Sequence, residues 1–333
     1  MKSVHFCAMS VITIPGHDGP TNVAVLGGGE WGRALASAAH RAGSKVLLIS
    51  RRERDSSLDA AILHSKDLLD APKHARLIVL TAPSAHVSAV VRELGAGLDG
   101  SYYVVHGVRG LVGADLRTVS DVVRTETAVR RVGALGGPAV ASELLEGKPN
   151  VLVCGSRFPE VCEVFSAAFA SSTLRVYPSN DLLGLEWASA LVGCLMIAVG
   201  YAQGLKMSPG LIAAFVSRSI GEASRITSAR GGDEHTLLGL AGYGDLLAST
   251  SQLHRPEVLL GRTLAQGKTL AEAVAVVKER VEAIELVPHV VKFATEQRVT
   301  APIFKALAEG ILGGKNAHTL IDDLMTQPIE HRA

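Results

Sequence analysis

Short β-branched runs alternate with longer Ala- and Leu-rich stretches from residue 22 onward. The short runs have the length of single strands, and the stretches between them are helix-like. Strands that alternate with helices form a parallel, doubly wound sheet with helices on both faces. The pattern predicts strands over residues 22–27, 45–50, 76–81, 102–106, 132–136, 150–155 and 174–177.

The pattern changes after Pro178, because no further strand-like run follows it. Asn180 or Asp181 can cap the first of the helices expected there. A chain of 333 residues is too long for one hydrophobic core. We therefore predict an N-terminal extension over 1–21, a Rossmann domain over 22–179 and an all-helical domain over 180–333. Helices are expected over 182–204, 211–229, 245–251, 269–277 and 288–295.

A glycine-rich turn, Gly27 to Gly32, follows the first predicted strand with the spacing G-x-G-x-x-G. Gly27 permits the tight turn, Gly29 lets the backbone approach a pyrophosphate, and Gly32 lets the next helix pack closely on the strand. Glu30 and Trp31 lie between the last two glycines, where helix N-terminal amides favour negative charge. Because the motif sits between a strand and a helix, it predicts a dinucleotide site.

The end of the second predicted strand indicates which dinucleotide binds. Enzymes that use NAD place a carboxylate there to accept from the ribose 2′-hydroxyl, whereas this chain has Ser50, Arg51 and Arg52. Guanidinium groups suit a 2′-phosphate because they bind phosphate oxygens in pairs and stay charged. The cofactor is therefore NADP or NAD, with NADP favoured, although two arginines can equally be solvated surface groups.

Composition narrows the classes of partner. The net charge of +1 offers no field for nucleic acid or an anionic membrane. The four cysteines form no C-x-x-C pair, so we expect reduced, buried thiols in a cytoplasmic protein and no metal site. No stretch matches a membrane span, because Glu186 interrupts the most apolar segment, residues 183–202. The apolar run near the N-terminus is short and broken by Ser10, which favours a loose extension over a signal peptide.

Several motifs in order resemble those of the bacterial NAD(P)-dependent glycerol-3-phosphate dehydrogenases. The first is Trp31 inside the glycine turn, and the second is Pro83-Ser84. The others are 136–141, which reads GGPAVA, 184–186, which reads GLE, and 239–246, which reads GLAGYGDL. The resemblance covers nearly all of residues 22–312. It implies a Rossmann domain, a helical second domain, and an active site in the cleft between them.

The resemblance also implies an activity and a set of contacts. The activity is reversible hydride transfer between NAD(P)H and dihydroxyacetone phosphate or a related small keto substrate, in a homodimer. Motif positions place the cofactor against Glu30, Trp31, Pro83, Ser84, His106 and Ala141. They place the substrate against Gly137, Ser249 and Arg255.

The substrate site departs from the family pattern. The family motif E-L-x-x-A-L-K-N carries an acid/base lysine and an asparagine, at which this chain has Val192 and Gly193. A second family lysine aligns with His106. The family's Arg-Asn pair, which grips the substrate phosphate, falls near 257–261, where no such pair exists, and Arg255 lies close by but out of register.

Each remaining candidate has two interpretations. His106 can supply the proton that a developing alkoxide needs, or it can be a partly buried histidine at a strand end. Asp245 can orient a catalytic group or cap the helix that follows it. Arg255 can bind an anionic substrate or lie in solvent, and Arg109 is expected at the surface.

Three functional hypotheses follow. The first is a working glycerol-3-phosphate dehydrogenase that uses His106 and Asp245 as catalytic residues. The second keeps hydride transfer but changes the small-molecule substrate. The third is a dinucleotide-binding protein without turnover, which predicts cofactor binding without oxidation by any keto substrate.

Overall fold

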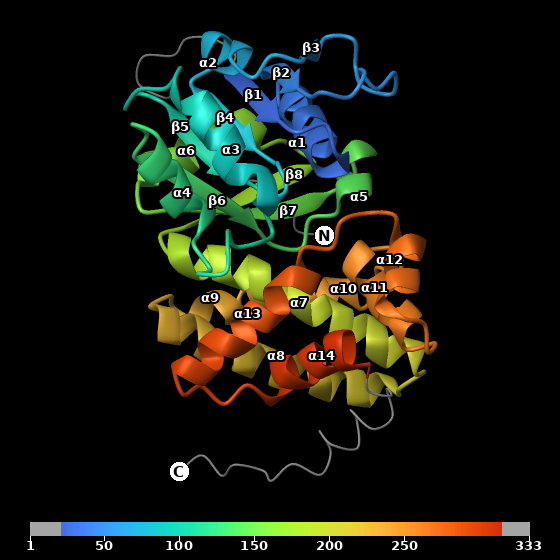
Figure 1. Ribbon diagram of the computed structural model, residues 1–333. Helices are drawn as coiled ribbons and strands as arrows, with labels where there is room; N and C mark the ends of the chain where they lie inside the picture. Colours follow the sequence, from blue (N-terminus) through green and yellow to red (C-terminus); the bar gives the residue numbers. More distant parts are fainter. Residues whose placement is uncertain (1–20, 315–333) are drawn as a thin grey trace, which may run out of the picture.

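The computed structural model describes residues 21–314, which form a sheet-containing N-terminal half and a helical C-terminal half (Figure 1). The sheet has eight strands in the order β3-β2-β1-β4-β5-β6-β7-β8, and only the β6–β7 pair is antiparallel. This order is that of a Rossmann sheet extended at one edge. The strands are β1 Asn22–Leu26, β2 Lys45–Ile49, β3 Leu63–Ser65, β4 Leu77–Leu80, β5 Tyr103–His106, β6 Arg131–Gly136, β7 Asn150–Ser156 and β8 Leu174–Ser179.

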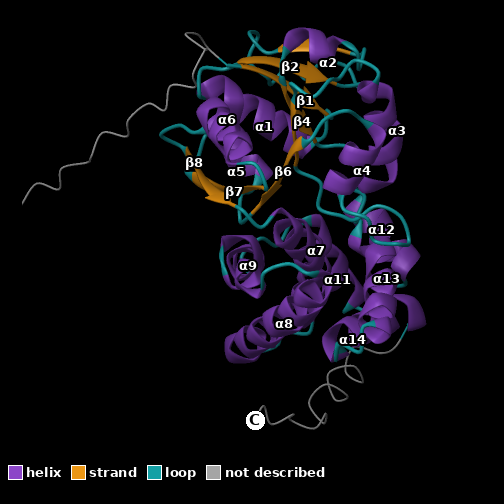
Figure 2. Ribbon diagram, turned by 90° about the vertical axis from the view of Figure 1, so that its left-hand side faces the viewer, coloured by secondary structure: helices purple, strands orange, loops and turns teal. Residues whose placement is uncertain are grey.

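Helices cover both faces of this sheet (Figure 2). One buried cluster joins α1 and α6 to the sheet, and another joins α2, α3 and α4 to the opposite face. The inner strands are buried on both sides, which explains their nearly continuous apolar sequences, whereas the edge strands β3 and β8 are more exposed. The helices are α1 Glu30–Arg41, α2 Asp70–His74, α3 Ser84–Gly95, α4 Val119–Glu126, α5 Ala141–Leu145 and α6 Pro159–Phe169.

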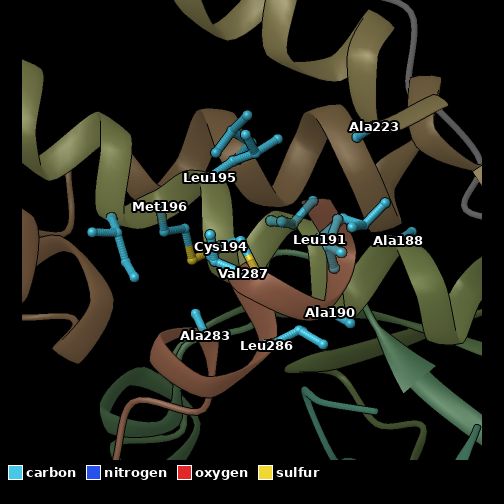
Figure 3. Close-up of a cluster of buried hydrophobic side chains, with 14 of the residues drawn as sticks. Ala188, Ala190, Leu191, Cys194, Leu195, Met196, Ala223, Ala283, Leu286 and Val287 are labelled. Atoms are coloured by element: carbon cyan, nitrogen blue, oxygen red, sulfur yellow. The ribbon is translucent and has the colours of Figure 1, made fainter. Parts of the chain in front are cut away.

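The second half packs its helices around α7, Leu182–Gly204, whose residues are almost all buried. Figure 3 shows Leu191 and Leu195 of this helix among side chains from neighbouring helices, including Val287. Asp181 caps α7 by accepting a hydrogen bond from the Gly184 amide. The remaining helices are α8 Pro209–Arg230, α9 Glu234–Leu238, the π-helical turn η1 Leu240–Gly244, α10 Asp245–Ser249, α11 Pro256–Leu264, α12 Leu270–Val277, α13 Ala283–Glu296 and α14 Pro302–Gly313.

The predicted fold class is confirmed, and all seven predicted strands are present. The pattern missed β3, because three residues at a sheet edge are too few to show a period. It also missed α9, α11 and α14, which are short or begin at a proline. From residue 180 to 314 the described chain contains no strand.

α7 is long and apolar enough to cross a membrane, but 89% of its most apolar window is buried inside the protein. Glu186 lies within the helix and is itself buried, so the helix is a core element. Three cysteines fall in the described residues, and all are free and buried: Cys154, Cys162 and Cys194. Cys7 and the rest of the predicted extension lie outside the described residues, apart from residue 21.

Candidate functional site

The turn between β1 and α1 has the shape of a pyrophosphate cradle. Gly27 has a φ of +125°, a conformation that favours glycine. A Cβ on Gly32 would overlap the Gly27 carbonyl, so only glycine lets α1 pack this closely on the turn. A Cβ on Gly29 would meet no atom within 4 Å, which means that this residue faces open space.

The N-terminus of α1 adds hydrogen-bond donors to that open space. Gly29 is the N-cap residue and no side chain caps the helix, so its first amides are available to a ligand. Amides and helix dipole together favour an anion there. The residues present therefore fit the diphosphate of a dinucleotide, and the three glycines lie where the motif predicts.

The chain after β2 presents two exposed guanidiniums, those of Arg51 and Arg52. Neither side chain has a hydrogen-bond partner among residues 21–314. The Ser50 hydroxyl accepts a hydrogen bond from the Arg52 amide at 3.1 Å, and Arg33 forms an ion pair with Asp55 just beyond. The end of β2 therefore keeps both positive charges free.

β4 and β5 end at the same sheet edge as β1. Leu80 and His106 are partners across these parallel strands, so His106, which ends β5, lies at the same edge as Pro83 and Ser84, which follow β4. Pro83 is the N-cap residue of α3, and the Ser84 amide donates to Glu282 at 2.6 Å. Glu282 comes from the helical half, and burial raises its pKa above the ordinary value.

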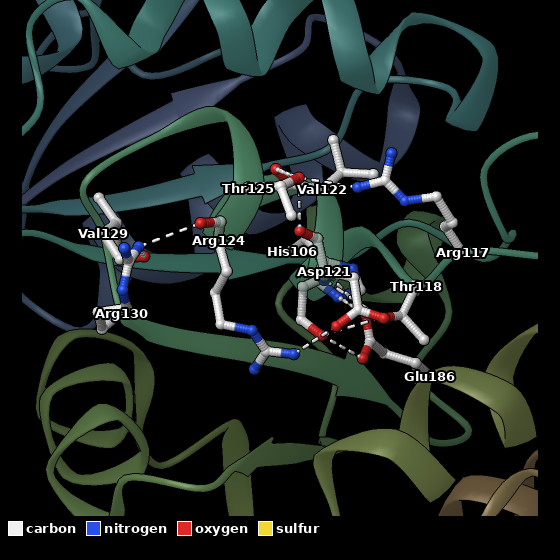
Figure 4. A network of polar contacts seen from close by, with 11 residues as sticks. His106, Arg117, Thr118, Asp121, Val122, Arg124, Thr125, Val129, Arg130 and Glu186 are labelled. Atoms are coloured by element: carbon white, nitrogen blue, oxygen red, sulfur yellow. Dashed lines mark hydrogen bonds and ion pairs between the residues drawn. The ribbon is translucent and has the colours of Figure 1, made fainter.

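His106 is 1% exposed and belongs to a buried polar network (Figure 4). Its Nε2 lies 2.9 Å from Oε1 of Glu186, a residue of α7. Glu186 also accepts hydrogen bonds from the amide and hydroxyl of Ser120 at 2.8 and 2.7 Å. The Nδ1 atom of His106 has no partner among the described residues. This histidine is therefore fully buried and held across the seam between the two halves.

The segment after His106 packs against Trp31 of the glycine-rich turn on one side and against Glu282 of the helical half on the other. A Cβ on Gly107 would overlap Nε1 of Trp31, and a Cβ on Gly110 would overlap a carboxylate oxygen of Glu282. These two glycines let the backbone pass between Trp31 and Glu282. Arg109 lies between the two glycines.

Arg109 pairs with Asp245 across the seam, with 2.6 Å between Nη1 and Oδ2. Arg255 binds the other oxygen of the same carboxylate, with 3.1 Å between Nη1 and Oδ1. Asp245 is fully buried, whereas the Arg109 and Arg255 side chains are 24% and 14% exposed. Two guanidiniums on one buried carboxylate therefore border the seam between the sheet and the helices.

Burial and neighbouring charges shift the pKa values of the two guanidiniums in opposite directions. Burial acts to lower the pKa of Arg109, but the carboxylates of Asp245 and Glu257 outweigh it and raise that pKa. Burial and the Arg109 charge lower the pKa of Arg255. Because a guanidinium ordinarily keeps its proton far above neutral pH, both groups remain cationic near neutrality. No group of three or more His, Cys, Asp or Glu residues among residues 21–314 is placed to hold a metal ion.

Comparison with known proteins identifies the family. Residues 22–162 match the domain described as NAD-dependent glycerol-3-phosphate dehydrogenase N-terminus, and residues 181–322 match the corresponding C-terminus. The NAD(P)+ glycerol-3-phosphate dehydrogenase of Moorella thermoacetica is 30% identical over 326 residues, covering 93% of this chain and 97% of that relative. This chain belongs to the NAD-dependent glycerol-3-phosphate dehydrogenase family.

Other relatives agree over the same length. The NAD(P)+ glycerol-3-phosphate dehydrogenase of Thermoanaerobacter sp. strain X514 is 28% identical, covering 93% of this chain and 98% of the relative. The crystal structure of the Coxiella burnetii glycerol-3-phosphate dehydrogenase has a TM-score of 0.85 at 24% identity, covering 92% of this chain and 99% of that chain. The yeast enzyme has a TM-score of 0.80 at 19% identity, covering 92% and 100%. Both structures share the fold described above.

The structure explains how this member of the glycerol-3-phosphate dehydrogenase family accommodates its changes on α7. Val192 is fully buried in the helical core. A Cβ on Gly193 would lie 3.2 Å from Cδ of Arg109, closer than side chains ordinarily pack. Gly193, at the family's asparagine position, therefore provides the space through which Arg109 reaches Asp245.

Three expectations for the site need correction. Arg109 is not a surface residue, because it pairs with a buried carboxylate. Asp245 does not cap α10, because its carboxylate accepts from the two arginines and Gly244 is the N-cap residue. Arg255 does not lie free in solvent. No local pattern marks Arg109 as a site residue, since its partner is 136 residues away.

The other predicted contacts are more dispersed. Ala141 begins α5 and is half-buried. Gly137 is buried in the turn after β6, with a φ of +101° that favours glycine. Ser249 is fully buried, and its hydroxyl donates to the Leu246 carbonyl at 2.6 Å. Glu186 and Glu282 join the site from the helical half, although sequence reasoning gave neither a role there.

Proposed function

We propose that this chain catalyses reversible hydride transfer between NAD(P)H and dihydroxyacetone phosphate, with glycerol 3-phosphate as the reduced product. The observation that carries the proposal is the match to both family domains, with the glycine cradle of the first intact. The curated relatives are named for this substrate and these cofactors. When bound, the reduced nicotinamide supplies the hydride.

The residues divide into two groups by role. Gly27, Gly29 and Gly32 hold the pyrophosphate, with Glu30 and Trp31 beside it at the start of α1. The next contacts to the cofactor are those at Pro83, Ser84, His106 and Ala141. The substrate lies beside Gly137, Ser249 and Arg255. These roles rest on motif position and on the shared edge where the strands end.

His106 is our candidate for proton delivery and Asp245 for orienting the groups around the substrate. His106 has one ring nitrogen held by Glu186 and the other without a partner, so a proton can be exchanged at Nδ1 without breaking the Glu186 contact. Asp245 is held rigidly by two guanidiniums, which suits an orienting role better than proton transfer.

We propose NADP as the preferred cofactor, because Arg51 and Arg52 are exposed beside the cradle and no carboxylate ends β2. We further propose domain boundaries after residues 21 and 179, a homodimer in solution, and a cytoplasmic location. The dimer rests on the family resemblance alone. The location is supported by the free, buried cysteines among the described residues.

The test is steady-state oxidation of NADPH by the purified full chain with dihydroxyacetone phosphate. We expect oxidation well above background, and slower oxidation with NADH at equal concentration. A panel of other small keto compounds serves as the comparison. Oxidation by another keto compound but not by dihydroxyacetone phosphate would replace the substrate, and tight NADPH binding without any oxidation would refute an enzymatic role.

A further inference from the structure

The seam holds one cation that neither the motifs nor the roles above use, the guanidinium of Arg109. It is the only side chain from the segment after β5 recorded in contact with Asp245 among the described residues. A guanidinium has five N–H donors, and one N–H to Asp245 is the only hydrogen bond recorded from this side chain within residues 21–314. Most of the donors of Arg109 therefore remain available to a ligand.

The position of Arg109 points to the reacting end of the substrate. Its neighbours Gly107 and Gly110 press against Trp31 and against Glu282, which in turn binds the Ser84 amide. Trp31 and Ser84 belong to the dinucleotide side of the seam, whereas Asp245 belongs to the helical side. Arg109 therefore lies where a molecule held between cofactor and helices would lie.

Arg255 is less suited to the same task. Its Nη1 is already shared between Asp245 and the Gln252 side chain, at 3.1 and 3.0 Å. Arg255 is the N-cap residue of α11, so it belongs to the helical half, whereas Arg109 belongs to the segment that contacts Trp31. Its guanidinium binds the Asp245 carboxylate and helps to hold it in place. Because two guanidiniums share one carboxylate, the cluster of Arg109, Asp245 and Arg255 carries a net positive charge.

Resting on the function proposed above, we propose that Arg109 is a catalytic residue that donates hydrogen bonds to the carbonyl oxygen of the keto substrate and stabilises the oxyanion formed there. In the reducing direction the hydride bonds to the carbonyl carbon, and the carbonyl π pair moves onto oxygen. Arg109 faces that negative charge as it develops, and His106 then supplies the proton that completes the alcohol. Arg109 itself keeps all its protons.

The position of Arg109 depends on the glycine at position 193, because the two residues are in contact. Any side chain at position 193 would compete with the Arg109 stem for space. Val192, where the family motif has a lysine, offers no charge, and the nearby guanidinium comes instead from the segment after β5. A preorganised cation next to the oxygen on which charge develops stabilises the transition state.

The first test is Arg109→Ala, assayed with NADPH and dihydroxyacetone phosphate. Losing one oxyanion donor typically lowers kcat by about 10²- to 10³-fold. We expect that loss with NADPH affinity and thermal midpoint close to wild type and with KM changed much less than kcat. Arg117→Ala is the matched control, because Arg117 lies in the same segment but donates to Thr125 instead. A kcat within a few-fold of wild type in Arg109→Ala would overturn the proposal while leaving the proposed function intact.

Two further readouts separate chemistry from packing. Added guanidinium ion should restore part of the lost kcat in Arg109→Ala and leave Arg117→Ala unchanged. Arg109→Lys should stay active and gain a descending alkaline limb, because a lysine titrates near 10.4, or lower when buried, whereas arginine does not. A purely structural role predicts neither rescue nor a new limb, and the absence of both in folded variants would overturn the proposal. If Arg109→Ala fails to fold, the absence of the alkaline limb in Arg109→Lys overturns it.

A third readout needs no turnover. Phenylglyoxal modifies accessible arginines, and the Arg109 side chain is 24% exposed. We expect dihydroxyacetone phosphate together with NADP+ to protect Arg109 from modification, as measured by peptide mass spectrometry, whereas Arg117 stays reactive. Unprotected Arg109 in an enzyme that turns over would overturn the inference alone. A chain that reduces no keto compound and shows no protection would overturn both the inference and the proposed function.

Discussion

At the scale of single residues, Gly29 offers the cleanest test of the cradle, because a side chain there would enter open space and disturb nothing else. We expect Gly29→Val to weaken NADPH binding by more than about tenfold, or about 1.4 kcal/mol, with the thermal midpoint unchanged. Titration of NADPH fluorescence measures the affinity. Gly210→Val is the control, since Gly210 also faces open space but lies at the start of α8. Equal affinity in both variants would rule out the cradle.

Arg51 and Arg52 are the residues that we expect to set the preference for NADPH over NADH. Both are exposed beside the cradle without side-chain partners in the described residues. The double variant Arg51→Ala with Arg52→Ala should lose the preference for NADPH over NADH, because no guanidinium then meets the 2′-phosphate. Dissociation constants for the two cofactors measure this. A preference that survives the double change would mean that the arginines are ordinary surface charges.

His106 is the residue with the most distinct kinetic expectation. If it delivers the proton, His106→Ala should lower kcat by about 10²- to 10⁴-fold with cofactor affinity near wild type. Glu186→Gln is the informative companion, since it keeps the histidine and a hydrogen-bond acceptor but removes the charge beside Nε2. Full activity in His106→Ala would mean that water, not His106, delivers the proton. Arg109 would then be the one protein group that we propose to act on the substrate oxygen.

At the scale of elements, α14 is held to α8 by a buried carboxylate. Glu222 accepts hydrogen bonds from the amides of Ile303 and Phe304 at 3.0 and 2.8 Å. Burial raises its pKa to about 7, from an ordinary value of 4.5. The folded state therefore binds this proton more tightly than the unfolded state does, so its stabilising contribution is complete below about pH 4.5 and is lost as pH rises through about 7.

The measurement is urea unfolding between pH 5 and pH 8, followed by the fluorescence of Trp187, which contacts Phe293 within the helical half. The difference in pKa corresponds to a fall of about 3 kcal/mol at most in the free energy of unfolding across this window. Glu222→Gln should flatten that slope, and Glu93→Gln, at an exposed position on α3, should not. An unchanged slope in Glu222→Gln would show that other groups cause it.

Elements were predictable where their sequence is long and periodic. The inner strands of the sheet carry continuous apolar runs because helices cover both faces, and α7 is a nearly unbroken apolar stretch. β3 was missed because it has three residues, and α11 because Pro256 marks its start rather than a loop. The π-helical turn at Leu240–Gly244 lies directly before Asp245, where a glycine-rich motif gave no helical signal.

At the scale of the whole molecule, the two halves make the site together. The glycine cradle was predictable because its contacts are local, within one strand-turn-helix unit. The Arg109–Asp245 and His106–Glu186 pairs were not, because they join residues 136 and 80 positions apart across the seam. The motif on α7 shows that Val192 replaces the family lysine. It does not show that the guanidinium of Arg109, from the segment after β5, lies beside the neighbouring Gly193.

We propose that this chain moves a hydride from a nicotinamide to the central carbon of dihydroxyacetone phosphate. The most direct measurement uses NADPH and NADH carrying deuterium on both positions of the nicotinamide C4, with mass spectrometry of the product. We predict glycerol 3-phosphate with one deuterium on its central carbon, formed faster from labelled NADPH than from labelled NADH. Cofactor bound by the chain with no deuterium transferred to that carbon would contradict the claim.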